Sequence, residues 1–181
     1  MVSPRGADMT QKIENIVIHH SAGPAGCAVE IDRMHRKQRG WTRIGYNAVF
    51  LNGYPNQRCW KENQRHGWCD GWMEWGRPFD CDDVVDADEV GAHAYGWNRK
   101  SFGLCMIGGV QEDITPRQLL SIRSFIIHHL LPMTKLPMQA VIGHNEVPGA
   151  STLCPGINMD LFRHFLADYH LIDDFFAPDE A

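Results

Sequence analysis

The chain has 181 residues, a length that suits one domain with a substantial hydrophobic core. Lys and Arg together number 17 and Asp and Glu number 22, so the formal net charge is −5. This acidic balance, without a compensating basic cluster, does not favour binding to nucleic acid. The sequence also lacks a continuous apolar run of membrane-spanning length. We therefore expect neither a nucleic acid partner nor membrane insertion.

Predicted strands and helices alternate along the first part of the chain. The β-branched run at 13–19 predicts a buried strand, and 28–39 carries apolar residues at helical spacing until Gly40. The segment 45–53 is a second predicted strand that ends in the turn signal Asn-Gly. After a long irregular stretch, 101–109 is a third predicted strand, which two glycines close.

The clearest predicted helix spans 115–131. Thr115 can cap its first turn and Pro116 fits the first helical position, where its missing N–H is not needed. Apolar residues then recur at helical spacing along one face. Pro132 and Pro137 are expected to end this helix.

Two more elements complete the alternation: a predicted strand at 139–145 and a predicted helix at 158–169. The pattern predicts a single α/β domain, 1–181, with a central mixed β-sheet flanked by helices. The tail at 173–181 is expected to be frayed.

Residues 54–90 do not follow this rhythm. The segment is rich in Trp, Cys, Gly and acidic residues, and we predict an inserted lobe, built as an elaborated hairpin or a long loop. Its tryptophans either extend a cleft for glycan stacking or form a small core of their own, and the small core is favoured. These are Trp60, Trp68, Trp72 and Trp75.

Four possible ligands in this lobe leave three interpretations open. They bind a second, structural zinc ion, they pair as disulfides after export, or they remain free thiols beside a histidine. The third interpretation is favoured. The residues are Cys59, His66, Cys69 and Cys81.

Histidines end two of the predicted strands, and a cysteine follows the second. His19 and His20 close the first strand, His144 closes the later one, and Cys154 lies in a Cys-Pro-Gly turn ten residues on. Two histidines and one cysteine form a known catalytic zinc set that leaves the fourth position for water. Side chains alternate along a strand, so only one of His19 and His20 can face a metal. The residues alone leave open which one.

Six stretches of the chain together resemble the zinc-dependent N-acetylmuramoyl-L-alanine amidases of the phage-lysozyme and peptidoglycan-recognition-protein type. They recur in the family's order and cover most of the chain outside 54–90. The stretches are IVIHHSAG (16–23), HRKQRGW (35–41), GYNAVF (45–50), GAHAYGWNRKSFGLCMIGG (91–109), ITPRQLLSIR (114–123) and GHNEVPGASTLCPG (143–156).

The resemblance implies an amidase fold and one catalytic Zn²⁺ ion, held by His19, His144 and Cys154. It implies that Tyr46 lies beside the zinc and helps to hold an oxyanion. Thr152 stands where phage enzymes carry Lys and recognition proteins often carry Thr, and its hydroxyl is a second candidate donor to the oxyanion.

The same resemblance places His93 and Asn98 in the substrate cleft, although Asn98 is equally suited to a turn. Glu146 follows His144 by two positions. It either orients a metal ligand as a carboxylate partner or is a solvated loop charge, and the solvated interpretation is slightly favoured.

The implied reaction is hydrolysis of the amide between N-acetylmuramic acid and L-alanine of peptidoglycan. The N-terminal stretch MVSPRGADMTQK lacks the apolar core of a signal peptide. We therefore expect a monomeric phage or prophage endolysin, made in the host cytoplasm, that acts on the cell wall after release. The alternatives are a module that binds peptidoglycan without cutting it and a secreted amidase effector. The presence of Cys154 and Tyr46 favours hydrolysis.

Overall fold

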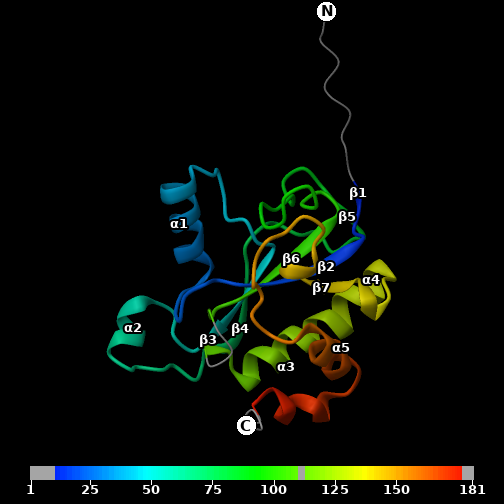
Figure 1. The fold of residues 1–181 in the computed structure, drawn as a ribbon. Coiled ribbons are helices and arrows are strands. Elements are labelled where there is room, and N and C mark those ends of the chain that lie inside the picture. Colours follow the sequence, from blue (N-terminus) through cyan, green and yellow to red (C-terminus); the bar gives the residue numbers. More distant parts are fainter. Residues whose placement is uncertain (1–10, 110–112, 177–181) are drawn as a thin grey trace, which may run out of the picture.

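A five-stranded mixed β-sheet forms the centre of the protein in the computed structural model, which describes residues 11–109 and 113–176. The strand order is β4-β3-β6-β2-β7; the last four strands are parallel, and β4 is antiparallel to β3 (Figure 1). A mixed sheet flanked by helices is thus confirmed. The strands are β2 (Asn15–His20), β3 (Ala48–Asn52), β4 (Asp70–Trp75), β6 (Ser101–Met106) and β7 (Val141–Gly143). Two short strands, β1 (Gln11–Lys12) and β5 (Val84–Val85), pair separately.

Helices cover both faces of the sheet. On one face α3 (Pro116–Phe125) and α5 (Met159–Ala167) pack against the larger apolar core, to which β2, β3, β6 and β7 all contribute. On the other face α1 (Ala28–Arg39) packs on a smaller core through Ala28 and Ile31. The bounds of α1 match the predicted helix, because Gly40 adopts the left-handed conformation (φ 67°) that ends it.

The pleat of β2 divides its side chains between the two faces. Ile16 and Ile18 belong to the core under α3 and α5, whereas Val17 packs with Ala94 and Val147 on the opposite side. Because side chains alternate along a strand, His19 points to the same side as Val17. The alternation of side chains along β2 therefore decides which of the two adjacent histidines reaches the site described below.

The predicted helix at 115–131 begins as expected but does not end at Pro132. Thr115 caps it in a capping box. The chain then continues through a π-helical turn (Ile126–Leu130) into α4 (Leu131–Thr134), and Lys135 closes it at φ 59°. A proline inside a regular α-helix clashes with the carbonyl four residues back, and the wider π-turn directly before Pro132 removes that conflict.

The segment 54–90 is more than the loop or hairpin that the sequence suggested. It contains the short helix α2 (Gln57–Lys61) and contributes β4 as the edge strand of the central sheet. Met73 packs on the larger core, and Glu74 accepts a hydrogen bond of 2.7 Å from the first N–H of α1. In β4, one side chain faces the apolar core and its neighbour makes a polar contact on the opposite side. This alternation is typical of an antiparallel strand at the edge of a sheet.

The tryptophans of this segment do not form a core of their own. Trp60, Trp68, Trp72 and Trp75 are between 43% and 71% exposed, so the small-core prediction is wrong. Because β4 joins the central sheet, the apolar anchor of the segment is that sheet and the indoles stay at its edge. Trp75 alone among them has ring contacts with core-side phenylalanines in the described structure, Phe79 and Phe125.

No disulfide joins the cysteines in the described residues. Cys69 is buried, and its thiol donates to the carbonyl of His66 at 3.3 Å. Cys81 instead lines an apolar cavity of about 580 Å³ beside α3 and α4. Within 11–109 and 113–176, Cys59 and these three residues form no group that could hold a second metal ion.

The C-terminal part is ordered further than predicted. After α5, a 3₁₀ helix (Tyr169–Phe175) brings Phe175 into the core, where it is 2% exposed and contacts Phe162 and Phe165. The expected fraying is therefore wrong for 173–176, and the rest of that tail lies outside the described residues. None of the described helices combines the length and apolar character needed to cross a membrane.

Candidate metal centre

The pairing of β2 with β7 brings two histidines together. The strands run parallel, and Ile18 is paired with Gly143, so the next residues, His19 and His144, are neighbours at the same sheet edge. β7 ends at Gly143, and His144 opens a 3₁₀ turn (His144–Glu146). The two imidazole ring centres are 4.6 Å apart.

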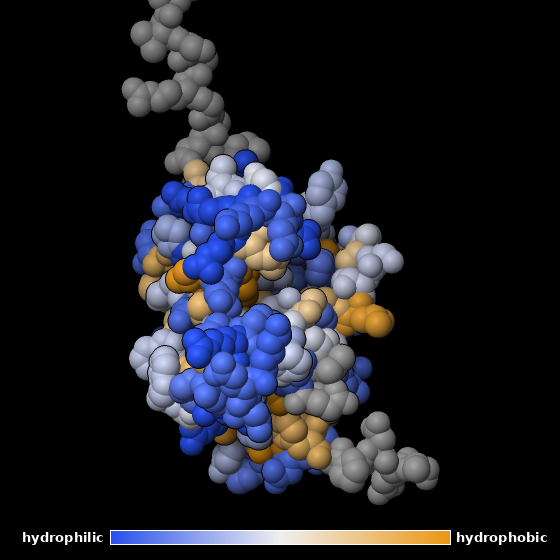
Figure 2. Space-filling view, turned by 90° about the vertical axis from the view of Figure 1, so that its left-hand side faces the viewer, coloured by the Kyte–Doolittle hydropathy of each residue, from blue (hydrophilic) through white to orange (hydrophobic). Residues whose placement is uncertain are grey.

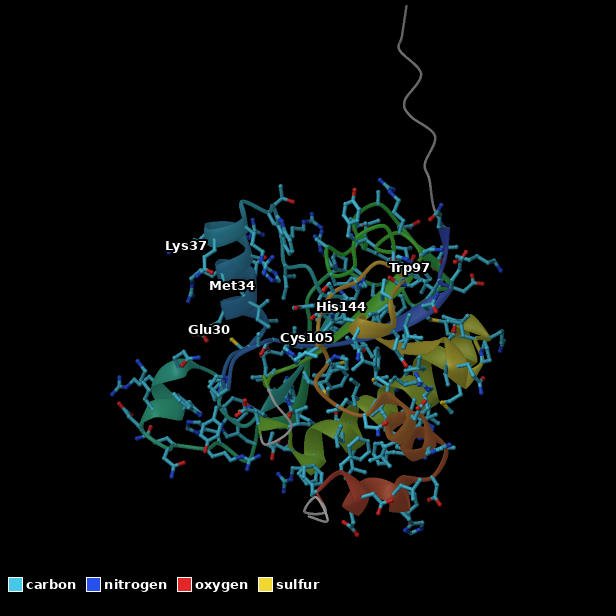
Figure 3. The ribbon with its side chains drawn as sticks, viewed as in Figure 1. Glu30, Met34, Lys37, Trp97, Cys105 and His144 are labelled. Atoms are coloured by element: carbon cyan, nitrogen blue, oxygen red, sulfur yellow. The ribbon has the colours of Figure 1, made fainter. Side chains whose placement is uncertain are left out.

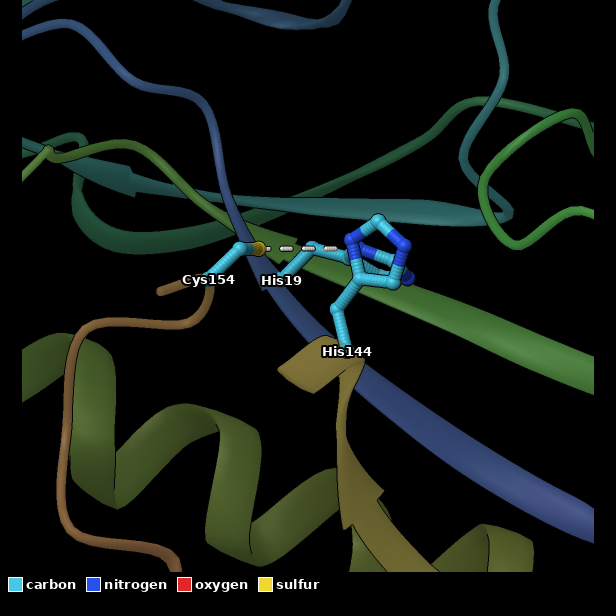
Figure 4. A group of neighbouring side chains, drawn as sticks. All are labelled: His19, His144 and Cys154. Carbon is cyan, nitrogen blue, oxygen red and sulfur yellow. Dashed lines mark hydrogen bonds between the residues drawn. The ribbon is translucent and has the colours of Figure 1, made fainter. Parts of the chain in front are cut away.

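A loop after this turn supplies the third group. The Sγ atom of Cys154 lies 3.7 Å from Nδ1 of His19, and it accepts a hydrogen bond of 3.3 Å from the backbone N–H of His20. Two backbone bonds hold the loop: Gly156 N–H donates to Leu153 at 2.8 Å, and Asn145 N–H donates to the Cys154 carbonyl at 2.7 Å. Figure 4 shows the three side chains converging from β2, the end of β7 and this loop.

The donor set and its spacing fit a zinc ion. One ligand atom from each of His19, His144 and Cys154 lies within 4.8 Å of the others. Tetrahedral zinc with ordinary Zn–N and Zn–S bonds separates a nitrogen and a sulfur ligand by roughly 3.6 Å. The distance between Nδ1 and Sγ, 3.7 Å, agrees with that value. His20 lies outside the group, and its Nδ1 accepts from the N–H of Ala22 at 2.9 Å.

Burial sets the protonation states of these side chains. It lowers the pKa of His19 well below its usual value, with a further contribution from His93, and it lowers the pKa of His144. Both imidazoles are therefore neutral at pH 7 and keep a lone pair for a metal. Burial also raises the pKa of the Cys154 thiol to about 11, against the opposing effect of the His20 N–H. A metal that binds there must displace the thiol proton.

Tyr46 lies beside His19, with 5.3 Å between the ring centres. The residue comes just before β3, and the thiol of Cys105 lies close enough to influence its phenol. Burial, followed by the nearby thiols of Cys105 and Cys154, raises the pKa of Tyr46 well above its usual value. The phenol therefore stays protonated and remains a hydrogen-bond donor across the physiological range.

Sequence reasoning missed Cys105. It lies in an apolar stretch of β6 and looks like a core residue, and it is indeed fully buried. The register of β6 against β2 pairs it with His19, which brings its thiol under the site. The sequence does indicate, from the alternation of side chains along a strand, which neighbours share a face with Cys105. That face can be assigned to the site only once the partner strand and its register are known.

His93 and Asn98 are near the centre but behind it. His93 is 7% exposed, and its Nδ1 lies 3.0 Å from Nε2 of His19. Burial lowers the pKa of His93 to about 4. The Oδ1 atom of Asn98 accepts the backbone N–H groups of His93 and Ala94, both at 2.8 Å. Asn98 thus makes the turn contact that the sequence left open as its alternative.

Thr152 is exposed near Cys154. Its Oγ1 accepts a hydrogen bond of 3.1 Å from the Cys154 N–H, which leaves its own O–H free to donate. Glu146 is exposed, as the solvated interpretation expects, but its carboxylate is paired. It forms a two-pronged ion pair with Arg163 of α5, at 2.9 and 3.0 Å, and accepts the Gly143 N–H at 2.7 Å. Glu146 therefore anchors the His144 turn to α5.

A cleft of mixed polar and apolar lining lies on the α1 side of the centre. The side of the molecule that carries α1 and α2 is mostly hydrophilic, with apolar residues visible in the hollow between its upper and lower parts (Figure 2). Figure 3 shows Glu30 and Met34 along α1, to one side of the strand ends that carry Cys105 and His144. A cavity of about 340 Å³ lies here, and its lining includes Ser21, Gly26, Glu30, Met34, Gln38 and Gln57.

The fold and the site define a class: mixed α/β proteins in which two histidines and one cysteine, able to hold a metal ion, meet at the ends of parallel strands. The family model of N-acetylmuramoyl-L-alanine amidases (Amidase_2) matches residues 9–157, and the chain belongs to this family. The family resemblance drawn from the sequence is confirmed.

Two relatives illustrate the range of this family. The endolysin of Klebsiella phage KP32 is 28% identical over 158 residues, which are 82% of this chain and 84% of the endolysin. Peptidoglycan-recognition protein LB of Drosophila melanogaster is 28% identical over 168 residues, 83% of this chain and 61% of that protein.

Solved structures confirm the fold. The N-acetylmuramoyl-L-alanine amidase LysC from Clostridium intestinale URNW has a TM-score of 0.62 and 25% identity, covering 92% of this chain and 95% of LysC. The wild-type Drosophila PGRP-LB structure has a TM-score of 0.58 and 24% identity, covering 92% of this chain and 89% of that one.

Proposed function

We propose that this protein is a zinc-dependent amidase that hydrolyses the bond between N-acetylmuramic acid and L-alanine in peptidoglycan. The observation that carries the proposal is the convergence of His19, His144 and Cys154, in a chain of the amidase family, within 4.8 Å of one another. The whole chain, 1–181, acts as one catalytic domain in this proposal.

The chain's own groups have distinct tasks. A bound zinc ion supplies a Lewis acid that polarises the amide carbonyl and lowers the pKa of water. Two neutral histidines and one thiolate leave that site a net charge of about +1, which suits an oxyanion. The protonated phenol of Tyr46 donates a hydrogen bond to the developing oxyanion, and the free O–H of Thr152 is a second donor.

The proposed substrate position is the cleft between α1 and α2, whose lining includes Ser21, directly after β2. Its lining carries amide, hydroxyl and carboxylate groups that suit the polar surface of a muramyl peptide. The proposed setting is that of an endolysin, because phage endolysins are among the relatives, and the match covers 82% of this chain and 84% of each endolysin. The protein then acts as a monomer on the cell wall, after synthesis in the host cytoplasm and release.

Dye release from purified, dye-labelled cell walls tests the reaction. We expect release by the zinc-loaded protein, loss of release after chelation, and recovery on adding zinc back. Cleavage at the proposed bond also creates a new α-amino group on L-alanine, which N-terminal labelling of the soluble products detects. New reducing sugar ends without new alanine amino groups would contradict the proposed bond.

The competing function is binding of peptidoglycan without cleavage, and recognition proteins among the relatives give it a specific basis. The complete ligand set and the placement of Tyr46 beside His19 favour hydrolysis. A pelleting assay with the same walls separates the two functions. Protein that pellets with the walls, contains zinc and releases neither dye nor alanine amino groups is a recognition module.

A further inference from the structure

His19 has two ring nitrogens, and each faces a different group. Nδ1 lies 3.7 Å from Sγ of Cys154, and Nε2 lies 3.0 Å from Nδ1 of His93. A neutral imidazole carries one proton, so it donates at one nitrogen and accepts at the other. The partner at Nε2 therefore determines whether Nδ1 has a free lone pair.

The ring of His93 occupies a space that the backbone keeps open for it. A Cβ atom on Gly103 of β6 would lie 2.6 Å from this ring, and a Cβ atom on Gly91 would lie 2.5 Å from it. Asn98 fixes the backbone at His93 and at the next residue. Any other residue at either glycine would push the imidazole away from His19.

The second nitrogen of His93 is unusual. Its Nε2 is buried and makes no hydrogen bond in the described part of the structure. A buried polar atom without a partner has a free-energy cost, so a ring held in this way requires a compensating role. Nδ1 of the ring contacts His19, and the backbone of Ser101 is a further polar neighbour, which raises the pKa of His93 against the effect of burial.

We propose that His93 is a positioning residue for the metal centre: its Nδ1 accepts the Nε2–H of His19 and thereby directs the Nδ1 lone pair of His19 to the metal. This inference rests on the proposed zinc function. In the opposite arrangement, His93 donates to Nε2 and the proton of His19 stays on Nδ1, where it faces Cys154 and blocks coordination. Ligating histidines commonly have such a partner on the nitrogen away from the metal.

This role differs from the substrate contact that the family resemblance implied for His93. The ring is 7% exposed and lies on the far side of His19 from Cys154, so it acts through the metal ligand. Asn98 acts one step further back, because its Oδ1 holds the backbone that presents His93.

Zinc affinity, measured by competition with a chromogenic chelator, tests the inference without a measurement of hydrolysis. His93→Phe keeps a ring in the space but removes the acceptor, and we expect zinc affinity to fall about 10- to 100-fold. His93→Gln restores an acceptor oxygen, and we expect recovery of most of the loss. Gly103→Ala changes no polar group and should weaken zinc binding by displacing the imidazole. His164→Phe, at an exposed position of α5, is the control and should leave the affinity unchanged.

A second measurement uses the unaltered protein, so it does not depend on the folding of a variant. Long-range ¹H–¹⁵N spectra of the zinc-bound protein should show the proton of His19 on Nε2 and none on Nδ1. A proton on Nδ1, or equal zinc affinity in His93→Phe and the unaltered protein, would overturn the inference and leave the proposed function standing. A different pair of results would contradict only the proposed function: His93→Phe binds zinc more weakly, and the unaltered protein, loaded with zinc, does not cut cell walls. Failure of the unaltered protein to bind zinc would overturn both.

Discussion

The pleat of β2 gives two adjacent histidines different roles. His19 lies in the metal group, whereas the side chain of His20 accepts from Ala22 and only its backbone N–H reaches Cys154. We expect His19→Ala to lose bound zinc and activity and His20→Ala to keep both, because alanine retains the backbone donor. Metal analysis of the purified variants measures this. A full zinc content in His19→Ala would contradict the assignment.

Tyr46 offers a test of oxyanion stabilisation. Tyr46→Phe keeps the ring beside His19 but removes the phenol donor, so we expect normal zinc content and a turnover about 10²- to 10³-fold lower. Wall hydrolysis and metal content are measured on the same preparation. Tyr95→Phe is the control, because Tyr95 is 98% exposed. An unchanged turnover in Tyr46→Phe would exclude the phenol from the reaction.

Proton release gives zinc binding a defined pH dependence. The Cys154 thiol, with a pKa of about 11, holds its proton at neutral pH and loses it when zinc binds. His19 and His144 have lowered pKa values, so they are already neutral and release none. Binding then releases one proton, and apparent zinc affinity should rise about tenfold per pH unit from pH 7 to pH 9. Chelator competition at several pH values measures the slope, and a flat profile would contradict it.

Among the elements, the start of α3 depends on one side chain. Thr115 Oγ1 accepts the N–H of Gln118 at 3.0 Å, and its own hydroxyl donates to Asp70 of β4. Thr115→Ala removes both bonds, and we expect a loss of about 1 to 2 kcal/mol in the free energy of unfolding. Denaturant titration measures it. Ser124→Ala, an exposed change in the same helix, should have little effect, and an equal loss in both variants would contradict the capping role.

Elements with a strong local signal were predictable, and those defined by pairing were not. The helix at 28–39 has its own apolar spacing and a glycine stop, so its bounds followed from the sequence. β4 reads DGWMEW, whose mixed composition gives no local strand signal; it becomes a strand because β3 offers it a free edge. The helix through Pro132 was missed because a π-turn leaves no simple sequence pattern.

Across the whole molecule, the identity of the candidate ligands was predictable but their mutual arrangement was not. The residue types in His19, His144 and Cys154, together with the family resemblance, suggested a zinc set from the sequence. Their convergence depends on the register of β2 with β7. The contact between His19 and His93 joins residues 74 positions apart and needs the space at Gly103, which only the assembled sheet reveals.

The proposed zinc ion also links parts of the fold that are distant in the chain: β2, the turn after β7 and the Cys154 loop. A ligand that binds only the folded protein adds about 4 kcal/mol of stability at a thousand times its dissociation constant. For a domain of this size, that corresponds to a rise of about 8 to 16 °C in melting temperature. We expect calorimetry to show this difference between zinc-loaded and chelator-treated protein.

Cys154→Ala supplies the matched control for this effect. It removes one ligand, so its melting temperature should be the same with zinc and with chelator, close to that of the chelated unaltered protein. His20→Ala keeps all three ligands and should retain the full difference. If zinc raised the melting temperature of Cys154→Ala as much as that of the unaltered protein, the ion would bind elsewhere. The His19, His144 and Cys154 group would then not be the site that ties these three segments together.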